Sequence, residues 1–203
     1  MGSEWRFFGE VFVTLFVIVD PPGTIPLFLS LTSGRSTATR RKTAWQAASV
    51  ALLVITAFAL FGQQLLDYLG ITLPALQCAG GLLLLLVALQ LLTGQESETV
   101  ASRDVNVALV PLGTPLLAGP GAIVATMVFV RRVDDGADAL ALAAGVLAVH
   151  LVLWLTMRYS VVIIRIIRES GVVLVSRIAG LLLSAIAVQL VADAVRSFIN
   201  EGA

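Results

Sequence analysis

Residues 20–26 read Asp-Pro-Pro-Gly-Thr-Ile-Pro and lie in the middle of an otherwise apolar stretch. Proline has no backbone N–H and its ring clashes with the preceding turn, so three prolines beside a glycine interrupt a helix. Asp20 lies about 13 residues into this stretch, or about 20 Å at the rise of a helix. We therefore predict a transmembrane helix that is broken near the midplane of the bilayer.

The composition around this break is that of a membrane protein. The chain has 203 residues, of which 58% are hydrophobic and 13% charged, and its mean hydropathy is +0.98. Soluble domains are about 25% charged, so this chain has too little polar surface to cover a soluble particle. A helix needs about 20 mostly apolar residues to cross a bilayer. Six stretches qualify: residues 7–32, 44–66, 73–93, 107–130, 137–159 and 172–198.

The two halves of the chain share a pattern. Pro22-Gly23 in the first span corresponds to Pro120-Gly121 in the fourth, 98 positions later. A Gly-Leu-Leu-Leu run followed by Ala-x-Gln recurs in the third and sixth spans, 99 positions apart. Three spans is an odd number, so the second copy enters from the opposite side. We predict one transmembrane domain over residues 1–203, built as two inverted three-helix repeats (about 7–94 and 106–198), an architecture of secondary transporters.

The fourth span is interrupted as the first is. Its Gly119-Pro120 pair also lies about 13 residues in, counted from the opposite face, so helices 1 and 4 are both predicted to be broken near the midplane. Irregular backbone persists in a bilayer only where it faces protein or a watery cavity. Freed N–H groups bind a carboxylate and freed carbonyls bind a cation, a combination that suits a zwitterion. The alternative is a pair of kinks that only shape helix packing.

The predicted substrate or ion site combines residues of both breaks. They are Asp20, Pro22, Gly23, Thr24, Thr114, Gly119, Pro120 and Gly121. Asp20 is the only acidic residue predicted deep in the bilayer, where a charge costs at least about 2.5 kcal/mol. It would bind a substrate ammonium or a cation, or carry a proton. The alternative is an N-cap of the half-helix after the break.

Three further polar residues fall within predicted spans. Gln90 and Gln189 occupy equivalent repeat positions and either line the cavity or form a hydrogen bond between helices. The second of these interpretations is the favoured one. For His150, which has no counterpart in the other repeat, a packed and hydrogen-bonded side chain is favoured over a proton relay.

The basic residues predict an orientation. Nine Lys and Arg residues lie on one set of alternate loops and four on the other. The positive-inside rule places the richer set in the cytoplasm. Both termini then lie outside, in the periplasm if the membrane is a bacterial inner membrane. Arg131 and Arg132, after the fourth span, oppose this assignment.

Other classes of function find less support. The net charge is zero, so no basic excess indicates nucleic-acid binding. Aspartyl chemistry needs two carboxylates at one site, and serine chemistry needs a base near the nucleophile. With only Asp20 deep in the bilayer and His150 as the sole histidine, an intramembrane enzyme is a weak alternative. No metal site or cofactor is predicted, apart from Na⁺ or H⁺ as a coupling ion.

At these motifs the chain resembles the MarC family of small integral membrane proteins. The family pattern Asp-Pro-x-Gly-Asn-x-Pro corresponds to residues 20–26, and Pro-Leu-Ala-x-Pro-Leu-Leu-Ala-Gly-Pro-Gly-Ala-Ile to residues 111–123. A last-span Arg-Ile-x-Gly-Leu-Leu with a following Ala-x-Gln corresponds to 177–182 and 187–189. Thr24 stands where the family usually has Asn, and Gly113-Thr114 replace Ala and an apolar residue.

This resemblance implies a six-helix inner-membrane protein related to the lysine-exporter superfamily. Some members look like ion-driven transporters of glycine and alanine. Together with the repeats, it leads us to predict a secondary transporter of a small polar solute, a neutral amino acid, coupled to an ion gradient. The lipid bilayer and a small-molecule substrate are its predicted partners. The alternative is a membrane partner or regulator that does not transport.

Overall fold

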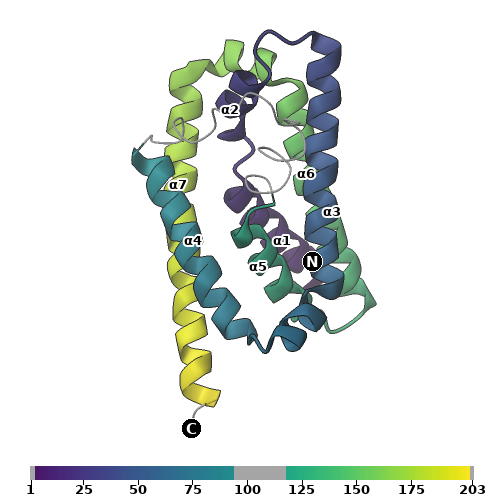
Figure 1. Cartoon of the computed structure of the whole chain (residues 1–203), viewed down its shortest axis with the longest axis vertical. Coiled ribbons are helices and arrows are strands. Elements are labelled where there is room, and N and C mark those ends of the chain that lie inside the picture. Colours follow the sequence, from purple (N-terminus) through teal and green to yellow (C-terminus); the bar gives the residue numbers. More distant parts are fainter. Residues whose placement is uncertain (1–2, 94–117, 202–203) are drawn as a thin grey trace.

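The structure is a computed structural model that describes residues 3–93 and 118–201. All regular structure in these two ranges is α-helical, and Figure 1 shows the helices as one bundle. The helices are α1 (Ser3–Val19), α2 (Thr24–Leu31), α3 (Thr37–Leu69), α4 (Leu73–Thr93), α5 (Pro120–Val130), α6 (Gly136–Arg158) and α7 (Ser160–Glu201). The predicted all-α class is therefore confirmed.

The described residues contain four helices that are long and apolar enough to cross a membrane. They are α3, α4, α6 and residues 170–200 of α7. A fifth span results if α1 and α2, which meet at an angle of 49°, count as one broken span. The 11-residue α5 forms the second part of the predicted fourth span, whose first part lies outside the described residues.

Two helices begin earlier than the sequence predicts. α3 begins at Thr37 rather than near residue 44, because the Ser36 hydroxyl accepts a hydrogen bond from the Thr39 N–H at 3.2 Å and caps it. The basic residues 40–42 therefore lie on a helix and not in the predicted loop. α7 begins at Ser160, but non-helical backbone at Arg168 (φ 62°, ψ 165°) divides it, and its membrane-spanning part, residues 170–200, agrees with the predicted span 172–198. The expected loop after α6 is helical because its apolar residues are interrupted by Arg at interfacial-helix spacing.

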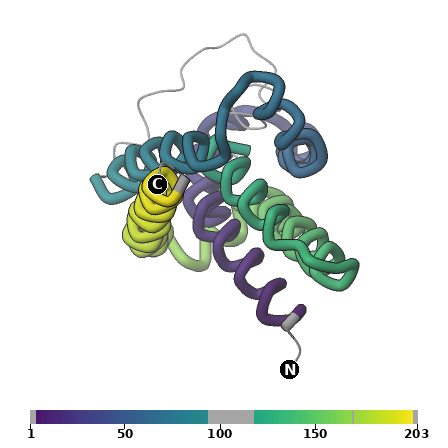
Figure 2. The backbone as a smooth tube through the Cα atoms, turned by 90° about the horizontal axis from the view of Figure 1, so that it is seen from below, coloured from purple at the N-terminus to yellow at the C-terminus, as the bar shows by residue number. Residues whose placement is uncertain are grey.

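The bundle has two apolar cores. The larger gathers buried side chains from α1, α2, α3, α5 and α6, and the smaller joins α4 and α7 with Val17 of α1. Figures 1 and 2 both show α4 and α7 side by side at one edge of the bundle, and α1 beside α6. Many large apolar side chains point outward, including Leu53, Leu60 and Phe61 of α3 and Leu82 and Leu86 of α4. Exposed apolar surface on several helices is what contact with lipid requires.

Two glycines let α4 and α7 approach closely. A Cβ atom on Gly81 would lie 2.8 Å from the Ala187 carbonyl oxygen, with Leu190 and Val191 as its next neighbours. A Cβ atom on Gly180 would lie 2.9 Å from Leu91, with Ala88 and Leu92 as its next neighbours. The neighbours of Gly180 become the neighbours of Gly81 when 99 is added to their numbers, and Gly180 itself lies 99 positions after Gly81. The two helices therefore cross antiparallel and make the same contacts in both directions.

Candidate functional site

The first break follows directly from its local sequence. α1 ends at Val19, and Asp20 has φ 43°, a left-handed backbone conformation that is uncommon for a residue other than glycine. α2 begins at Thr24, whose N–H donates to the Asp20 carbonyl at 3.1 Å and whose hydroxyl donates to the Pro21 carbonyl at 2.7 Å. The bond between Thr24 and Asp20 has the i to i−4 spacing of a helix, whereas Pro21 and Pro22 have no N–H to donate to the carbonyls of the preceding turn, so α1 ends before them.

Asp20 is buried within this break. Asp20 is 7% exposed, and within the described ranges its Oδ2 atom has no hydrogen bond of good geometry, although the Gly23 N–H and the Ser176 hydroxyl lie near the carboxylate. The N-cap of α2 is Gly23, with no side-chain cap hydrogen bond, so Asp20 does not occupy the cap position that the alternative interpretation gave it. A buried carboxylate oxygen without a partner is destabilising unless a proton, a cation or a donor satisfies it.

Gly23 leaves space for two polar side chains. A Cβ atom at Gly23 would overlap the Asp20 carboxylate and lie 2.9 Å from the hydroxyl oxygen of Ser176 on α7. Ser176 is itself buried, at 6% exposed. The structure thus brings a carboxylate and a hydroxyl together over Gly23, from segments more than 150 positions apart in the sequence.

Sequence reasoning missed Ser176. One signal was available, because Ser176 lies one helical turn before Gly180 and so shares the face of the helix that carries the repeat glycine. That spacing does not indicate that this face also approaches the first break.

The second break is described from Ala118 onward. Gly119 is the N-cap of α5 with extended backbone (φ −61°, ψ 162°), and Pro120 is the first residue of the helix, where a missing N–H leaves no bond unmade. Gly121 is buried against the Leu84 side chain of α4, so that it serves close helix packing. Thr114 lies outside the described residues.

Apolar residues beside the two breaks belong to one core. Val19 and Phe28 flank the first break, Ala118 and Ala122 flank the second, and all four are buried in the larger apolar cluster. Thr24 is also buried, at 5% exposed. Residues of one apolar core therefore flank both interruptions.

The two repeat glutamines lie elsewhere. Gln90 and Gln189 are both exposed. The Gln189 amide donates to Asp193 at 2.8 Å, and both residues belong to α7. The favoured interpretation, a hydrogen bond between two helices, is therefore wrong for Gln189. His150 is buried, and its Nδ1 atom lies 2.8 Å from the Val146 carbonyl oxygen, in agreement with the packed interpretation.

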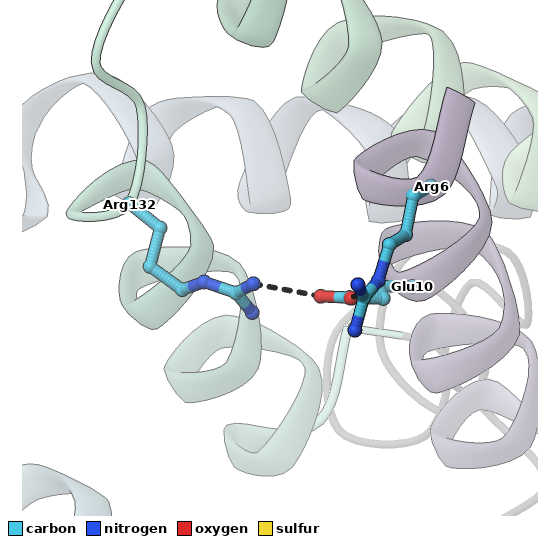
Figure 3. A network of polar contacts seen from close by, with 3 residues as sticks. All are labelled: Arg6, Glu10 and Arg132. Atoms are coloured by element: carbon cyan, nitrogen blue, oxygen red, sulfur yellow. Dashed lines mark hydrogen bonds and ion pairs between the residues drawn. The ribbon is translucent and has the colours of Figure 1, made fainter. Parts of the chain in front are cut away.

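An ion pair joins α1 to the connection after α5. Nη2 of Arg132 lies 2.7 Å from Oε2 of Glu10, and Nε of Arg6 lies 3.3 Å from Oε1 of the same carboxylate. Figure 3 shows Arg132 reaching the Glu10 carboxylate from the segment after α5, while Arg6 comes to it from the same helix as Glu10. The Arg132 guanidinium also lies over the rings of Phe7 and Phe129, at 5.3 and 5.5 Å from their centroids. The two segments that end or begin at the breaks are thereby linked at their far ends.

A family profile described as "MarC family integral membrane protein" matches residues 5–199. The chain belongs to the MarC family. Among its relatives, the UPF0056 membrane protein MJ1677 of Methanocaldococcus jannaschii is 34% identical over 200 residues, which cover 95% of this chain and 98% of the relative. UPF0056 membrane protein YhcE of Escherichia coli is 31% identical over 203 residues, covering 95% and 94%. A UPF0056 membrane protein of Archaeoglobus fulgidus is 36% identical over 194 residues, covering 92% and 91%.

Membership of the MarC family makes this chain a multi-pass integral membrane protein, which agrees with its long apolar helices. Its relatives come from bacteria and archaea, and the alignments extend over nearly the whole chain. No solved structure matches the chain significantly.

Proposed function

We propose that this MarC-family protein is a secondary transporter of a small zwitterionic solute, a neutral amino acid such as glycine or alanine, driven by an ion gradient. The solute site lies at the break between α1 and α2, where Asp20, Gly23 and Thr24 meet Ser176 of α7. Residues 119–121 at the start of α5 contribute from the second break. The protein has no enzymatic role in this proposal.

The observation that carries the proposal is the buried carboxylate of Asp20 in a broken helix. Its unpartnered oxygen suits a proton, Na⁺ or a substrate ammonium group, each of which offsets the unfavourable burial. Interrupted helices at matching places in two halves mark the binding sites of many secondary transporters. The N-cap of α2 is Gly23, so the Asp20 carboxylate does not occupy the N-cap position.

The contacts between α4 and α7 support inverted repeats. In the proposed six-helix architecture, these two helices are the third span of each repeat, related by a two-fold axis in the membrane plane. Such an axis would give Gly81 and Gly180 equivalent neighbours, which they have. Two repeats of opposite orientation provide two alternative arrangements around one site, and alternating access follows from exchange between them.

The structure supplies partners for the two arginines that oppose the predicted orientation. Arg132 pairs with Glu10, and Arg131 donates to the Gln63 side chain at 2.9 Å. These interactions account for the two arginines on the sparsely basic side without a role in topology. We therefore propose that the termini lie on the outer side of the cell membrane.

The test is uptake of radiolabelled alanine and glycine into proteoliposomes under an imposed Na⁺ or H⁺ gradient. We expect gradient-dependent uptake by the wild-type protein, and no coupled uptake by Asp20→Asn, which keeps the shape but not the charge. Asp193→Asn, which alters an exposed carboxylate on α7, is the matched control and should transport normally. Wild-type protein that is folded yet moves neither solute under either gradient would contradict the proposal, as would coupled transport by Asp20→Asn.

A further inference from the structure

A cavity of about 580 Å³ lies where α3 turns into α4. Figure 1 shows this turn toward the lower end of the bundle, beside the last part of α7. Its walls come from α3, the turn, α4, Arg131 after α5, and α7. The polar side chains among its lining residues are Gln63, Asp67, Thr72, Gln77, Arg131 and Ser197. A large cavity with one cation and one carboxylate in its wall suits a ligand that carries both charges.

The two charged side chains in the wall are separated by an amide. Arg131 donates to Oε1 of Gln63 from Nε at 3.3 Å and from Nη2 at 2.9 Å. Nε2 of Gln63 in turn donates to Oδ1 of Asp67 at 2.7 Å. The amide thus presents an acceptor to the guanidinium and a donor to the carboxylate. A zwitterion presents the same polarity, with a carboxylate in place of the acceptor and an ammonium in place of the donor.

The frame around these side chains is held by the turn. Gly70 ends α3 in the left-handed conformation (φ 66°), and the Ile71 N–H donates to the Leu66 carbonyl at 2.9 Å. The Thr72 hydroxyl accepts from the Ala75 N–H at 3.3 Å and so caps the start of α4. These hydrogen bonds hold Asp67 and the start of α4 at fixed positions beside the cavity.

The half-helix α5 connects this cavity to the second break. α5 begins at Pro120, and Arg131 is its C-cap. At the rise of a helix, the backbone of Arg131 lies about 16 Å from that of Pro120 at the break. Gly80 of α4, one turn after the cavity residue Gln77, packs against Val124 of α5. The cavity therefore lies on the outer side of the proposed solute site, at the other end of the same half-helix.

We propose that this cavity is an outer binding site for a zwitterion, in which Arg131 binds the anionic group and Asp67 the ammonium group in place of the Gln63 amide. The inference rests on the proposed function and extends it, because the site would receive the solute before it reaches the break. A free amino acid has this chemistry, and so does the headgroup of phosphatidylethanolamine.

The test is calorimetric titration of the purified full-length protein in detergent with L-alanine and, separately, with O-phosphoethanolamine. Arg131→Gln and Asp67→Asn should each weaken binding roughly tenfold or more, the effect of losing a hydrogen bond to a charged group. Gln63→Ala should strengthen binding about threefold, because it removes the internal competitor. Arg196→Gln and Asp193→Asn remove a charged pair outside the cavity and are the matched controls.

The outcomes separate the two proposals. Alanine binding that is unchanged in Arg131→Gln and Asp67→Asn overturns the cavity site, whereas intact coupled uptake by wild-type protein leaves the proposed function standing. Binding of O-phosphoethanolamine but not alanine, lost in the same two variants, assigns the zwitterion site to a lipid headgroup. Loss of binding in Gln63→Ala contradicts the exchange of amide for ligand. If both variants raise the KM for alanine uptake and Asp20→Asn abolishes its maximal rate, the outer site and the site at the break are both supported.

Discussion

Arg132 and Glu10 form an ion pair at 2.7 Å although 122 positions separate them. The pair joins α1, which ends at the first break, to the residues just after α5, which begins at the second. The Arg132 and Glu10 side chains are 51% and 35% exposed, so solvent screens their attraction. The link therefore holds the two broken segments together with a modest free energy that a conformational change could overcome.

We predict that Glu10→Gln and Arg132→Gln are coupled by no more than about 1 kcal/mol in the free energy of unfolding. The physical reason is the partial exposure of both side chains, although the Phe7 and Phe129 rings add a cation–π contribution on the arginine side. A double-mutant cycle in mixed micelles, repeated at high salt, measures the coupling. Arg6→Gln is the control for the weaker contact with Glu10. A coupling energy well above 1 kcal/mol that persists at high salt would contradict the prediction.

Gly23→Ala should abolish uptake and destabilise the protein by about 1–3 kcal/mol, the usual range for overpacking. The added Cβ would overlap the Asp20 carboxylate and crowd the Ser176 hydroxyl. Uptake and thermal unfolding of the same preparation measure both effects. Gly9→Ala is the control, since a Cβ there meets nothing within 4 Å. Wild-type transport by Gly23→Ala would mean that the carboxylate is not held over this glycine.

Ser176→Ala should leave the protein folded and raise the KM for the coupling ion or the solute by roughly tenfold, as expected for one lost hydrogen bond to a charged group. The Ser176 hydroxyl is buried beside the Asp20 carboxylate, so its loss changes what that carboxylate can hold. Uptake kinetics at varied ion and solute concentrations provide the measurement. Ser184→Ala is the matched control, because the Ser184 hydroxyl donates to the Leu181 carbonyl of its own helix. Equal kinetics of the two variants would remove Ser176 from the site.

Gly81→Ala and Gly180→Ala should destabilise the protein by similar amounts, each about 1–3 kcal/mol. Each added Cβ would lie within 3 Å of the opposing helix, on a carbonyl oxygen in one case and on Leu91 in the other. Thermal unfolding checks the prediction, with Gly9→Ala again as the control. If one glycine tolerates alanine and the other does not, the two sides of the interface are not equivalent in energy.

Much of the fold could be predicted from the sequence because its determinants are local. Pro21 and Pro22 follow an apolar helix and cannot donate to its last turn, and the structure has the break there, with Pro26 in the first turn of α2. The third span, predicted over residues 73–93, coincides with α4 because Thr72 caps it, Pro74 lies in its first turn and the run is mostly apolar. The early start of α3 and the helical residues 160–167 before the last span were missed, since polar and basic residues near a membrane surface are as compatible with a helix as with a loop.

The candidate site could be predicted only in part. Asp20 stood out because a carboxylate deep in an apolar span is unusual, and the structure confirms that it is buried. Ser176 could not be found in this way, because serine is common in membrane helices and its contact depends on how α7 is rotated toward the break. The cavity beside the turn between α3 and α4 was missed for the same reason. Gln63, Asp67 and Arg131 each resemble ordinary residues at the end of a span.

The sequence alone determined that this protein spans a membrane repeatedly and that at least one of its helices is broken. Both properties follow from the hydrophobicity of each stretch and the backbone chemistry of proline and glycine, which act over a few neighbouring residues. Only the tertiary structure decided that Ser176 lies beside Asp20, that Gly81 and Gly180 make reciprocal contacts, and that Arg131 and Asp67 share a cavity. These relationships depend on the rotation and register of packed helices, and those are settled by side-chain packing between segments far apart in the chain.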